Sequence, residues 1–348
     1  MLSSLTMMKT VMQLARLQRC STAHLRELQE KRFRELLRFA IQNSAYYRDR
    51  FHGIDPEHCR LSDVPTLCKS ELMANFDRLV TDPAIKLADA QRFLDDKSSP
   101  GRLYLGRYSV WHTSGSEGQP TIVLADRREM ALICAVRMAR GNCLPKTYRN
   151  VLRHLLRRSR VATVRVGRAL NPSGAMLDYT PRAVRPFVKI LALQHSEGIG
   201  RIVERLNEFR PHFLTGYPHV LESLAEQERS GRLRLRGGLV QITSIAEPLS
   251  SSVRETLQNT FAAPVLDIYA MGECIQLSEG CPQFGGSHVN MDLAMLEVVD
   301  GDNQPVNPGA AGSRVLVTNL CNHVQPLIRY EVNDVVTISP KPCPCGSP

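Results

Sequence analysis

Apolar residues recur at intervals of three and four between residues 22 and 51, which predicts a long amphipathic helical region. Ser21 or Thr22 can cap its start, because a side-chain oxygen there accepts a hydrogen bond from the first turn. Ser70 is expected to open a short helix over residues 70–79. The first 20 residues contain three basic residues and no acidic one. We expect a poorly ordered lead-in there rather than a targeting peptide, because no apolar core or cleavage site is visible.

The middle of the chain alternates between helical and strand-like patterns. Residues 127–141 and 197–210 have helical spacing, whereas 239–244 (LVQITS) and 263–269 (APVLDIY) are short apolar runs typical of buried strands. A predicted helix over 250–261 joins the two strands. This β–α–β order indicates a parallel sheet.

The pattern changes again towards the end of the chain. Residues 295–300, 313–320 and 334–340 are rich in β-branched side chains and are separated by turn-forming segments, which predicts an antiparallel β subdomain. We therefore expect an α/β protein in three consecutive parts. These are a helical region over 1–95, an α/β core over 96–280 and a β-rich subdomain over 281–348.

Composition excludes several classes of protein. The 348 residues are 43% hydrophobic and 22% charged, which is ordinary for a globular protein and argues against disorder. No run approaches the roughly 20 apolar residues of a membrane span. The ten cysteines do not form a regular framework of pairs, so a reducing cytoplasm is favoured.

The formal net charge of +10 is concentrated in one segment. Residues 146–168 hold eight basic side chains and no acidic one. Proteins that bind nucleic acids interleave aromatic side chains with arginines for stacking, and Tyr148 is the one aromatic residue here, so we expect no nucleic-acid partner. The segment suits a solvated face near an active site, attraction of a polyanionic cofactor, or a membrane surface.

Three short motifs have candidate chemistry. Residues 112–120 (HTSGSEGQP) pack hydroxyls and glycines into a loop whose backbone N–H groups can wrap phosphate oxygens. Residues 267–273 (DIYAMGE) form a predicted buried strand, at whose carboxyl end Tyr269 can stack on a base and Glu273 can hold Mg²⁺. Residues 326–334 (PLIRYEVND) end in an aspartate that can accept both hydroxyls of a ribose. Each motif alone is also compatible with a surface loop or with core packing.

In their order along the chain, the motifs resemble those of the adenylate-forming superfamily. The series is Thr-Ser-Gly-Ser-x-Gly-x-Pro, then Gly-Tyr-Pro at 216–218, Ser-x-Ala-Glu at 244–247, Tyr-x-x-Gly-Glu, and Ile-Arg-Tyr-x-x-x-Asp. The chain is similar to the phenylacetate–CoA ligase family and its capsule-biosynthesis-type relatives from about residue 25 to its end. The resemblance implies the fold of the large N-terminal domain of these enzymes, with parallel α/β subdomains and a β-rich subdomain.

The resemblance also implies roles for individual residues. A phosphate loop would bind ATP, a second group would line the adenine, and Asp334 would bind the ribose. Glu273 would support Mg²⁺ and Arg329 would face the nucleotide. The phosphate loop comprises Thr113, Ser114, Gly115, Ser116 and Gly118, the adenine group comprises Ser244, Ala246, Glu247, Asp267 and Tyr269, and the acyl pocket is expected at Gly216, Tyr217 and Pro218.

Cysteine and histidine residues late in the chain suggest a metal site. Cys281, His288, Cys343 and Cys345 offer one imidazole and three thiolates, a set that suits a closed tetrahedral Zn²⁺ site with no free position for catalysis. Their spacing alone is a modest signal. The resemblance implies the same four ligands and a structural role for the zinc. Cys274 and Cys321 are the competing ligands.

The sequence departs from the family pattern in several places. Glu117 puts a negative charge into the expected phosphate loop, Gln119 stands where lysine is frequent, and Gly272 stands where a hydroxyl residue is usual. The chain stops at Pro348, where relatives continue into a small C-terminal domain that carries a catalytic lysine. Loss of such an electrostatic group typically costs on the order of a hundredfold in rate. No lysine earlier in the sequence stands out as a substitute.

The implied activity is that of an acid–thiol ligase. A small carboxylic acid would react with ATP and Mg²⁺ to give acyl-AMP and pyrophosphate, and coenzyme A would then displace AMP. The absent domain would be encoded separately, or the activity would be impaired. Two other classes stay open. One is a non-catalytic nucleotide- or acyl-binding module, and the other is a membrane-surface partner in polysaccharide biosynthesis that uses Arg153, Arg157 and Arg158.

Overall fold

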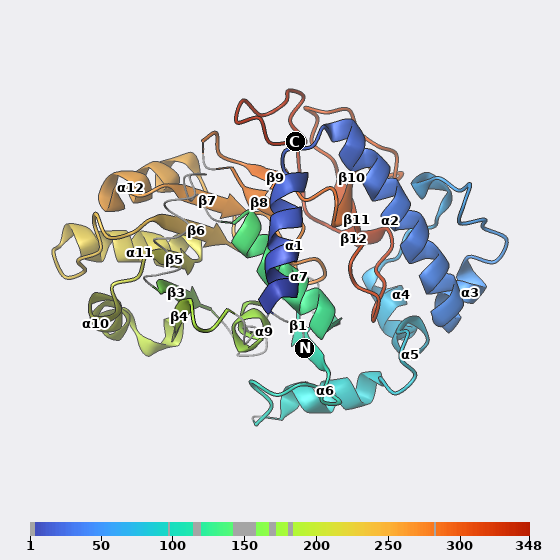
Figure 1. Ribbon diagram of the computed structural model, residues 1–348, viewed down its shortest axis with the longest axis horizontal. Helices are drawn as coiled ribbons and strands as arrows, with labels where there is room; N and C mark the ends of the chain where they lie inside the picture. Colours follow the sequence, from blue (N-terminus) through green and yellow to red (C-terminus); the bar gives the residue numbers. More distant parts are fainter. Residues whose placement is uncertain are drawn as a thin grey trace. The chain divides into compact units, whose positions relative to one another are not determined.

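Contacts between residues divide the chain into two compact units, each assembled from separate stretches of sequence. The first unit comprises Met1–Ala15, Ala131–Ala270 and Ser278–His288, and the second comprises Arg16–Met130, Met271–Leu277 and Val289–Pro348. The computed structural model describes residues 4–96, 98–113, 120–141, 158–166, 172–179, 184–281 and 283–348 (Figure 1). Within these ranges no helix is long and apolar enough to cross a membrane.

The first unit is built around a five-stranded sheet. Its strand order is β4-β3-β5-β6-β7, and every pairing is parallel, as the predicted β–α–β pattern requires. The sheet therefore confirms the α/β fold class. Its strands are β3 (Ser159–Arg165), β4 (Val188–Gln194), β5 (Phe213–Gly216), β6 (Gln241–Ile245) and β7 (Val265–Ile268).

Helices cover this sheet and close its core. Contacts join α10 to β4, α11 to β6 and α12 to β7, and Figure 1 shows the three helices beside the strands. Ser250 caps α12 by accepting a hydrogen bond from the backbone N–H of Val253 at 3.2 Å. Leucine, isoleucine and valine side chains from both layers form one buried cluster. The helices are α9 (Pro172–Asp178), α10 (Ile199–Phe209), α11 (Pro218–Arg229) and α12 (Ser251–Phe261), and a 3₁₀ turn, η2, spans His195–Glu197.

The second unit contains an antiparallel hairpin and a three-stranded antiparallel sheet. The β-rich character of the chain's end is confirmed, but residues 334–340 are not a strand. The third strand is β12 instead, because Val315–Val317 of β11 pair with Tyr330–Val332. The hairpin is β1 (Tyr108–His112) with β2 (Ile122–Asp126), and the sheet is β10 (Ala294–Val299), β11 (Arg314–Asn319) and β12 (Tyr330–Val332). A separate two-stranded sheet pairs β8 (Ser278–Gly280) with β9 (Ser287–Val289).

The predicted N-terminal helical region is present in the second unit. Ser21 is its cap, because Ser21 Oγ accepts a hydrogen bond from the backbone N–H of His24 at 3.3 Å. The apolar face of α2 packs in a cluster that includes Leu36, Leu320 and Leu327. The helix predicted to begin at Ser70 is α4, and it begins one residue earlier, at Lys69, directly after Cys68. The elements are α2 (Thr22–Asn43), α3 (Ala45–Arg50), the 3₁₀ turn η1 (Leu61–Asp63), α4 (Lys69–Ala74), α5 (Phe76–Leu79) and α6 (Leu87–Asp95).

Two further helices each contain a position in the sequence where one unit ends and the other begins. The first is α7 (Arg127–Ala139), which confirms the helical spacing seen there. The second is α1 (Ser4–Leu17), so the expectation of a poorly ordered start is wrong for these residues. Met7 and Leu14 of α1 are buried, which explains why the segment is ordered.

Most of the basic segment 146–168 lies outside the described residues, including Arg153 and Arg157.

Candidate functional site

The carboxyl ends of three parallel strands bring several expected site residues into one row. Gly216 at the end of β5 pairs with Ser244 of β6, and Ser244 pairs with Asp267 of β7. Open parallel sheets bind their ligands at this edge, where the loops that follow the strands present side chains and backbone groups. Residues predicted from separate motifs are therefore neighbours at the edge where a ligand is expected.

The Asp267 carboxylate is half-buried in this row. Burial raises its pKa, whereas the nearby Ser244 hydroxyl and the positive charge of Arg254 oppose the rise. The Asp267 backbone also lies close to Gly280 of β8. A Cβ at position 280 would be 2.7 Å from the Asp267 carbonyl oxygen, so only glycine permits this approach.

Two serine side chains hold the backbone of Tyr269, which follows β7. Its N–H donates to Ser287 Oγ at 3.3 Å, and its carbonyl oxygen accepts from Ser278 Oγ at 2.5 Å. The Tyr269 residue itself is only partly buried. Its backbone is therefore fixed while part of the residue stays accessible to a ligand.

The turn after β6 has an unfavourable backbone conformation. Ala246 has a φ of 68°, in the left-handed region that costs a residue with a Cβ roughly 1–2 kcal/mol. Such conformations cluster at ligand sites. The next residue, Glu247, places Oε2 2.8 Å from Nδ1 of His219. Burial above all, and then the negative charge of Glu247, raises the pKa of Tyr217. The next residue, Pro218, begins α11.

In the second unit, the expected phosphate loop connects β1 to β2. His112 pairs with Ile122, and two hydrogen bonds close the base of the loop. The Thr113 N–H donates to the Thr121 carbonyl at 2.9 Å, and the Thr121 N–H donates to Thr113 Oγ1 at 3.3 Å. The loop residues Ser114, Gly115, Ser116, Glu117, Gly118 and Gln119 lie outside the described residues.

Residues far apart in the sequence surround the Glu273 carboxylate. Tyr330 donates its hydroxyl to Glu273 Oε1 at 3.3 Å. Burial raises the Glu273 pKa, while hydrogen bonds from Tyr330 and Thr113 and the positive charge of Lys69 oppose the rise. Behind it, Trp111 Nε1 donates to the Gly272 carbonyl at 3.0 Å, so the backbone that presents Glu273 is fixed. A carboxylate that hydroxyl groups contact, and on which a lysine acts through its charge, can bind a cation or face a phosphate.

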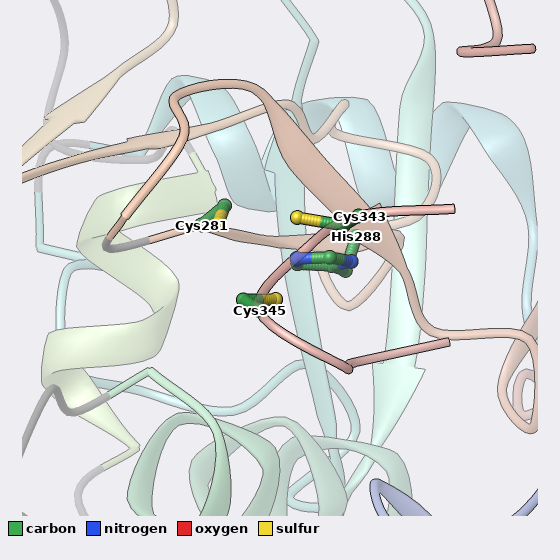
Figure 2. Close-up of side chains that lie close together, drawn as sticks. All are labelled: Cys281, His288, Cys343 and Cys345. Atoms are coloured by element: carbon green, nitrogen blue, oxygen red, sulfur yellow. The ribbon is translucent and has the colours of Figure 1, made fainter. Parts of the chain in front are cut away.

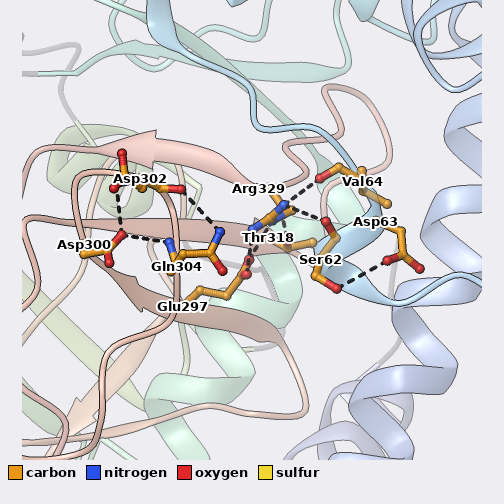
Figure 3. A network of polar contacts seen from close by, with 9 residues as sticks. All are labelled: Ser62, Asp63, Val64, Glu297, Asp300, Asp302, Gln304, Thr318 and Arg329. Carbon is orange, nitrogen blue, oxygen red and sulfur yellow. Dashed lines mark hydrogen bonds and ion pairs between the residues drawn. The ribbon is translucent and has the colours of Figure 1, made fainter.

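Arg329 has partners other than a nucleotide. Its guanidinium donates to both carboxylate oxygens of Glu297, at 3.1 and 3.0 Å, and to the carbonyl oxygens of Ser62 and Val64, at 3.3 and 2.7 Å. Figure 3 shows this network, in which the backbone N–H of Arg329 also donates to Thr318 Oγ1. The Arg329 side chain is 8% exposed. The geometry therefore assigns it to holding the second unit together, and we do not retain it as a nucleotide contact.

Asp334 lies just beyond β12, in an exposed segment. Exposure leaves it accessible to a ligand, and its assignment to a ribose stays a prediction.

Four side chains form a candidate metal centre. One ligand atom each from Cys281, His288, Cys343 and Cys345 lies within 4.8 Å of the others (Figure 2). In a tetrahedral Zn²⁺ site with Zn–S distances of about 2.3 Å, neighbouring sulfur atoms are about 3.8 Å apart, so the residues fit the metal. The competing ligands Cys274 and Cys321 are not in this group.

Comparisons with known proteins identify relatives over almost the whole chain. No protein-family model matches it. Phenylacetate-coenzyme A ligase of Thermus thermophilus is 26% identical over 338 residues, covering 92% of this chain and 67% of that protein. Protein CapK of Staphylococcus aureus is 22% identical and covers 94% of this chain and 65% of that protein.

The chain is a homologue of the phenylacetate-coenzyme A ligases.

This ligase homologue also has the fold of a solved relative. The crystal structure of 2-hydroxyisobutyryl-CoA ligase, in complex with 2-HIB-AMP and CoA, matches it with a TM-score of 0.70 at 20% identity. The match covers 95% of the chain and 67% of that structure. The predicted fold of adenylate-forming enzymes is thereby confirmed. The chain spans about two thirds of the length of these relatives.

Sequence reasoning missed two side chains around Glu273 in the ligase homologue. Lys69, at the start of α4, is more than 200 positions from Glu273 in the sequence and carries no motif of its own. Tyr330 stands inside a predicted motif, in which the resemblance implies roles only for the arginine before it and the aspartate after it. No local pattern distinguishes Lys69 from a surface lysine, because its significance comes from its neighbours.

A second missed group is a buried polar network behind Glu273. Asn319 Nδ2 donates to Glu129 Oε1 at 3.0 Å and to the Glu273 carbonyl at 3.1 Å, and Gln276 Nε2 donates to Asn319 Oδ1 at 2.8 Å. Glu129 is 4% exposed. Burial above all, with a smaller contribution from Asp126, raises its pKa from 4.5 to about 8, although the hydrogen bond from Asn319 and the nearby Gln276 side chain oppose the rise. At neutral pH Glu129 is therefore mostly protonated.

Proposed function

We propose that this homologue is an acyl-CoA ligase that activates a small carboxylic acid. A carboxylate oxygen of the acid attacks the α-phosphorus of ATP, and pyrophosphate leaves. The sulfur of coenzyme A, as a thiolate, then attacks the acyl carbon, and AMP leaves. Support comes from relatives named as CoA ligases and from the fold shared with a CoA ligase.

The observation that carries the proposal is the surroundings of Glu273. Thr113 stands at the base of the glycine- and serine-rich loop and hydrogen-bonds Glu273. The positive charge of Lys69 also stabilises the ionised form of this carboxylate. Mg²⁺ prefers carboxylate and phosphate oxygens, and it would neutralise the charge on the phosphates. Glu273 would hold the metal, and Lys69 would attract the phosphates of the substrate.

The other proposed contacts follow the predicted motifs. The row of Ser244 and Asp267, with Tyr269 beyond it, would line the adenine, and Asp334 would bind the ribose. Ala246 and Glu247 would complete the adenine group. The expected loop residues would bind the phosphates, and Gly216–Pro218 would border the acid. Chemistry of this kind depends on positioning and on neutralising charge, with no covalent intermediate on the protein.

Acid-dependent pyrophosphate release tests the function directly. The purified chain is incubated with ATP, Mg²⁺ and a panel of alkyl and aryl carboxylic acids, each with and without coenzyme A. We expect release with at least one acid, with a roughly hundredfold fall in Glu273→Gln and a fall of about tenfold or more in Lys69→Gln, because each variant removes charge from the phosphate site.

The matched control is Lys86→Gln, which removes an exposed lysine paired at 3.9 Å with Asp77. Its rate should equal that of the wild type. Bound AMP without acid-dependent release would favour the non-catalytic binding module. An unchanged rate in Glu273→Gln would contradict the role given to that carboxylate.

We further infer that Cys281, His288, Cys343 and Cys345 bind a structural Zn²⁺. The four donors complete a tetrahedral set, which leaves no position for a substrate. Bound zinc would link Cys343 and Cys345 to ligands that lie more than 50 positions earlier in the sequence.

Zinc content and thermal stability should fall together in Cys343→Ser. Zinc measured by atomic emission should be close to one per wild-type chain and well below that in the variant, with a lower melting temperature, because metal binding contributes to folding free energy. Cys59→Ser, at a cysteine outside the cluster, is the control and should keep its zinc. Wild-type protein that folds without zinc and gains no stability from it would refute the site.

A further inference from the structure

Three loops at the carboxyl edge of the parallel sheet bring a second polar group together. His195 follows β4, Tyr217 and His219 follow β5, and Glu247 follows β6. The His219 ring packs edge-on against His195 and at a steep angle against Tyr217, with ring centroids 5.7 and 5.9 Å away. His219 therefore stands at the centre of this group, beside the segment proposed to border the acid.

Glu247 determines which ring nitrogen of His219 is available. Its Oε2 lies 2.8 Å from His219 Nδ1. In a neutral histidine, a carboxylate at Nδ1 fixes the proton on that nitrogen, which makes Nε2 a hydrogen-bond acceptor. Among the residues that the structure describes, none forms a hydrogen bond with His219 Nε2.

We propose that His219 selects the acyl group, and that the acid carries a hydroxyl that donates to His219 Nε2. The inference rests on the proposed function, since it concerns the acid that is activated. A hydroxy acid would satisfy the acceptor that Glu247 prepares, whereas a purely alkyl or aryl acid would leave that acceptor to water or without a donor. Sites that hydrogen-bond a substrate hydroxyl discriminate against the analogue that lacks it.

The size of the discrimination follows from the exposure of the group. The His219 and Glu247 side chains are 47% and 39% exposed, so water can compete for Nε2. A deeply buried polar site discriminates by ten thousandfold or more, whereas a net hydrogen bond in a partly solvated site corresponds to roughly tenfold. The alternative is a surface ion pair without any role in selection, and such a pair would leave relative affinities unchanged.

Binding of non-reactive acyl-adenylate analogues tests selection without requiring turnover. Acyl-sulfamoyl adenosines are compared in pairs by calorimetry: 2-hydroxyisobutyryl with isobutyryl, 3-hydroxybutyryl with butyryl, and 4-hydroxyphenylacetyl with phenylacetyl. In the wild type, the hydroxylated member of at least one pair should bind about tenfold more tightly. In His219→Leu the two members should bind within about twofold of each other, because the acceptor is gone.

Two further variants separate selection from folding. His219→Gln keeps an acceptor oxygen and should retain part of the preference. His58→Leu is the matched control, since it removes an exposed histidine whose Nδ1 lies 2.6 Å from Asp55, and it should keep the full preference. Equal binding of both members of every pair by the wild type would overturn this proposal while leaving the ligase intact. Failure of every analogue to bind would overturn the proposed function as well.

Discussion

Replacing Arg329 by methionine is expected to lower the free energy of unfolding by about 3–5 kcal/mol. The arginine is 8% exposed and forms a two-pronged ion pair with Glu297, whose side chain is 16% exposed. Without Arg329, the Glu297 charge stays buried with no compensating cation. The carbonyl oxygen of Val64, which is buried, also loses its donor, and an unpaired buried acceptor adds to the loss.

Urea unfolding followed by circular dichroism measures this loss. The control is Arg38→Met, at an exposed pair with Glu57, where the loss should stay below about 1 kcal/mol. Adding Glu297→Gln to Arg329→Met should recover part of the stability, because the orphaned charge disappears. A loss for Arg329→Met no larger than that of the control would show that the buried pair contributes nothing. A selective loss of nucleotide affinity in a fully stable variant would instead restore the role predicted from the sequence.

Replacing Glu129 by glutamine should remove a pH dependence of stability. The folded protein holds a proton on Glu129 up to a pKa of about 8, whereas in the unfolded chain the pKa is about 4.5. Between these values the folded state binds more protons, so the wild-type free energy of unfolding falls as the pH rises from 4.5 to 8. The full difference is bounded by about 5 kcal/mol, at about 1.4 kcal/mol for each pH unit.

Glutamine is neutral at every pH and nearly the same size as protonated glutamate. The variant and the wild type should therefore be equally stable near pH 4, and the variant should be more stable by a few kcal/mol near pH 8.5. Urea unfolding at several pH values gives both curves, and Glu57→Gln, at an exposed carboxylate, is the control. Parallel curves for wild type and Glu129→Gln would show that Glu129 is already ionised in the folded protein.

Much of the architecture could be predicted because it depends on short-range patterns. The apolar spacing of α2, the serine caps of α2 and α12, and the β6–α12–β7 order are encoded within a few neighbouring residues. The third strand of the antiparallel sheet could not be predicted in this way. Residues 334–340 have the composition of a strand, but the partner positions of β11 are taken by Tyr330–Val332. Strand pairing depends on register and packing as well as on propensity.

The same division applies to the candidate site. The sequence by itself determined the fold class and the order of the motifs, because residue types at fixed spacing encode local conformation and donor groups. Only the tertiary structure decided the partners of Arg329, the charge of Lys69 near Glu273 and the contact between His219 and Glu247. These relations join residues that are 28 to more than 200 positions apart, and Coulomb and hydrogen-bond energies depend on distance in space, which chain order does not specify.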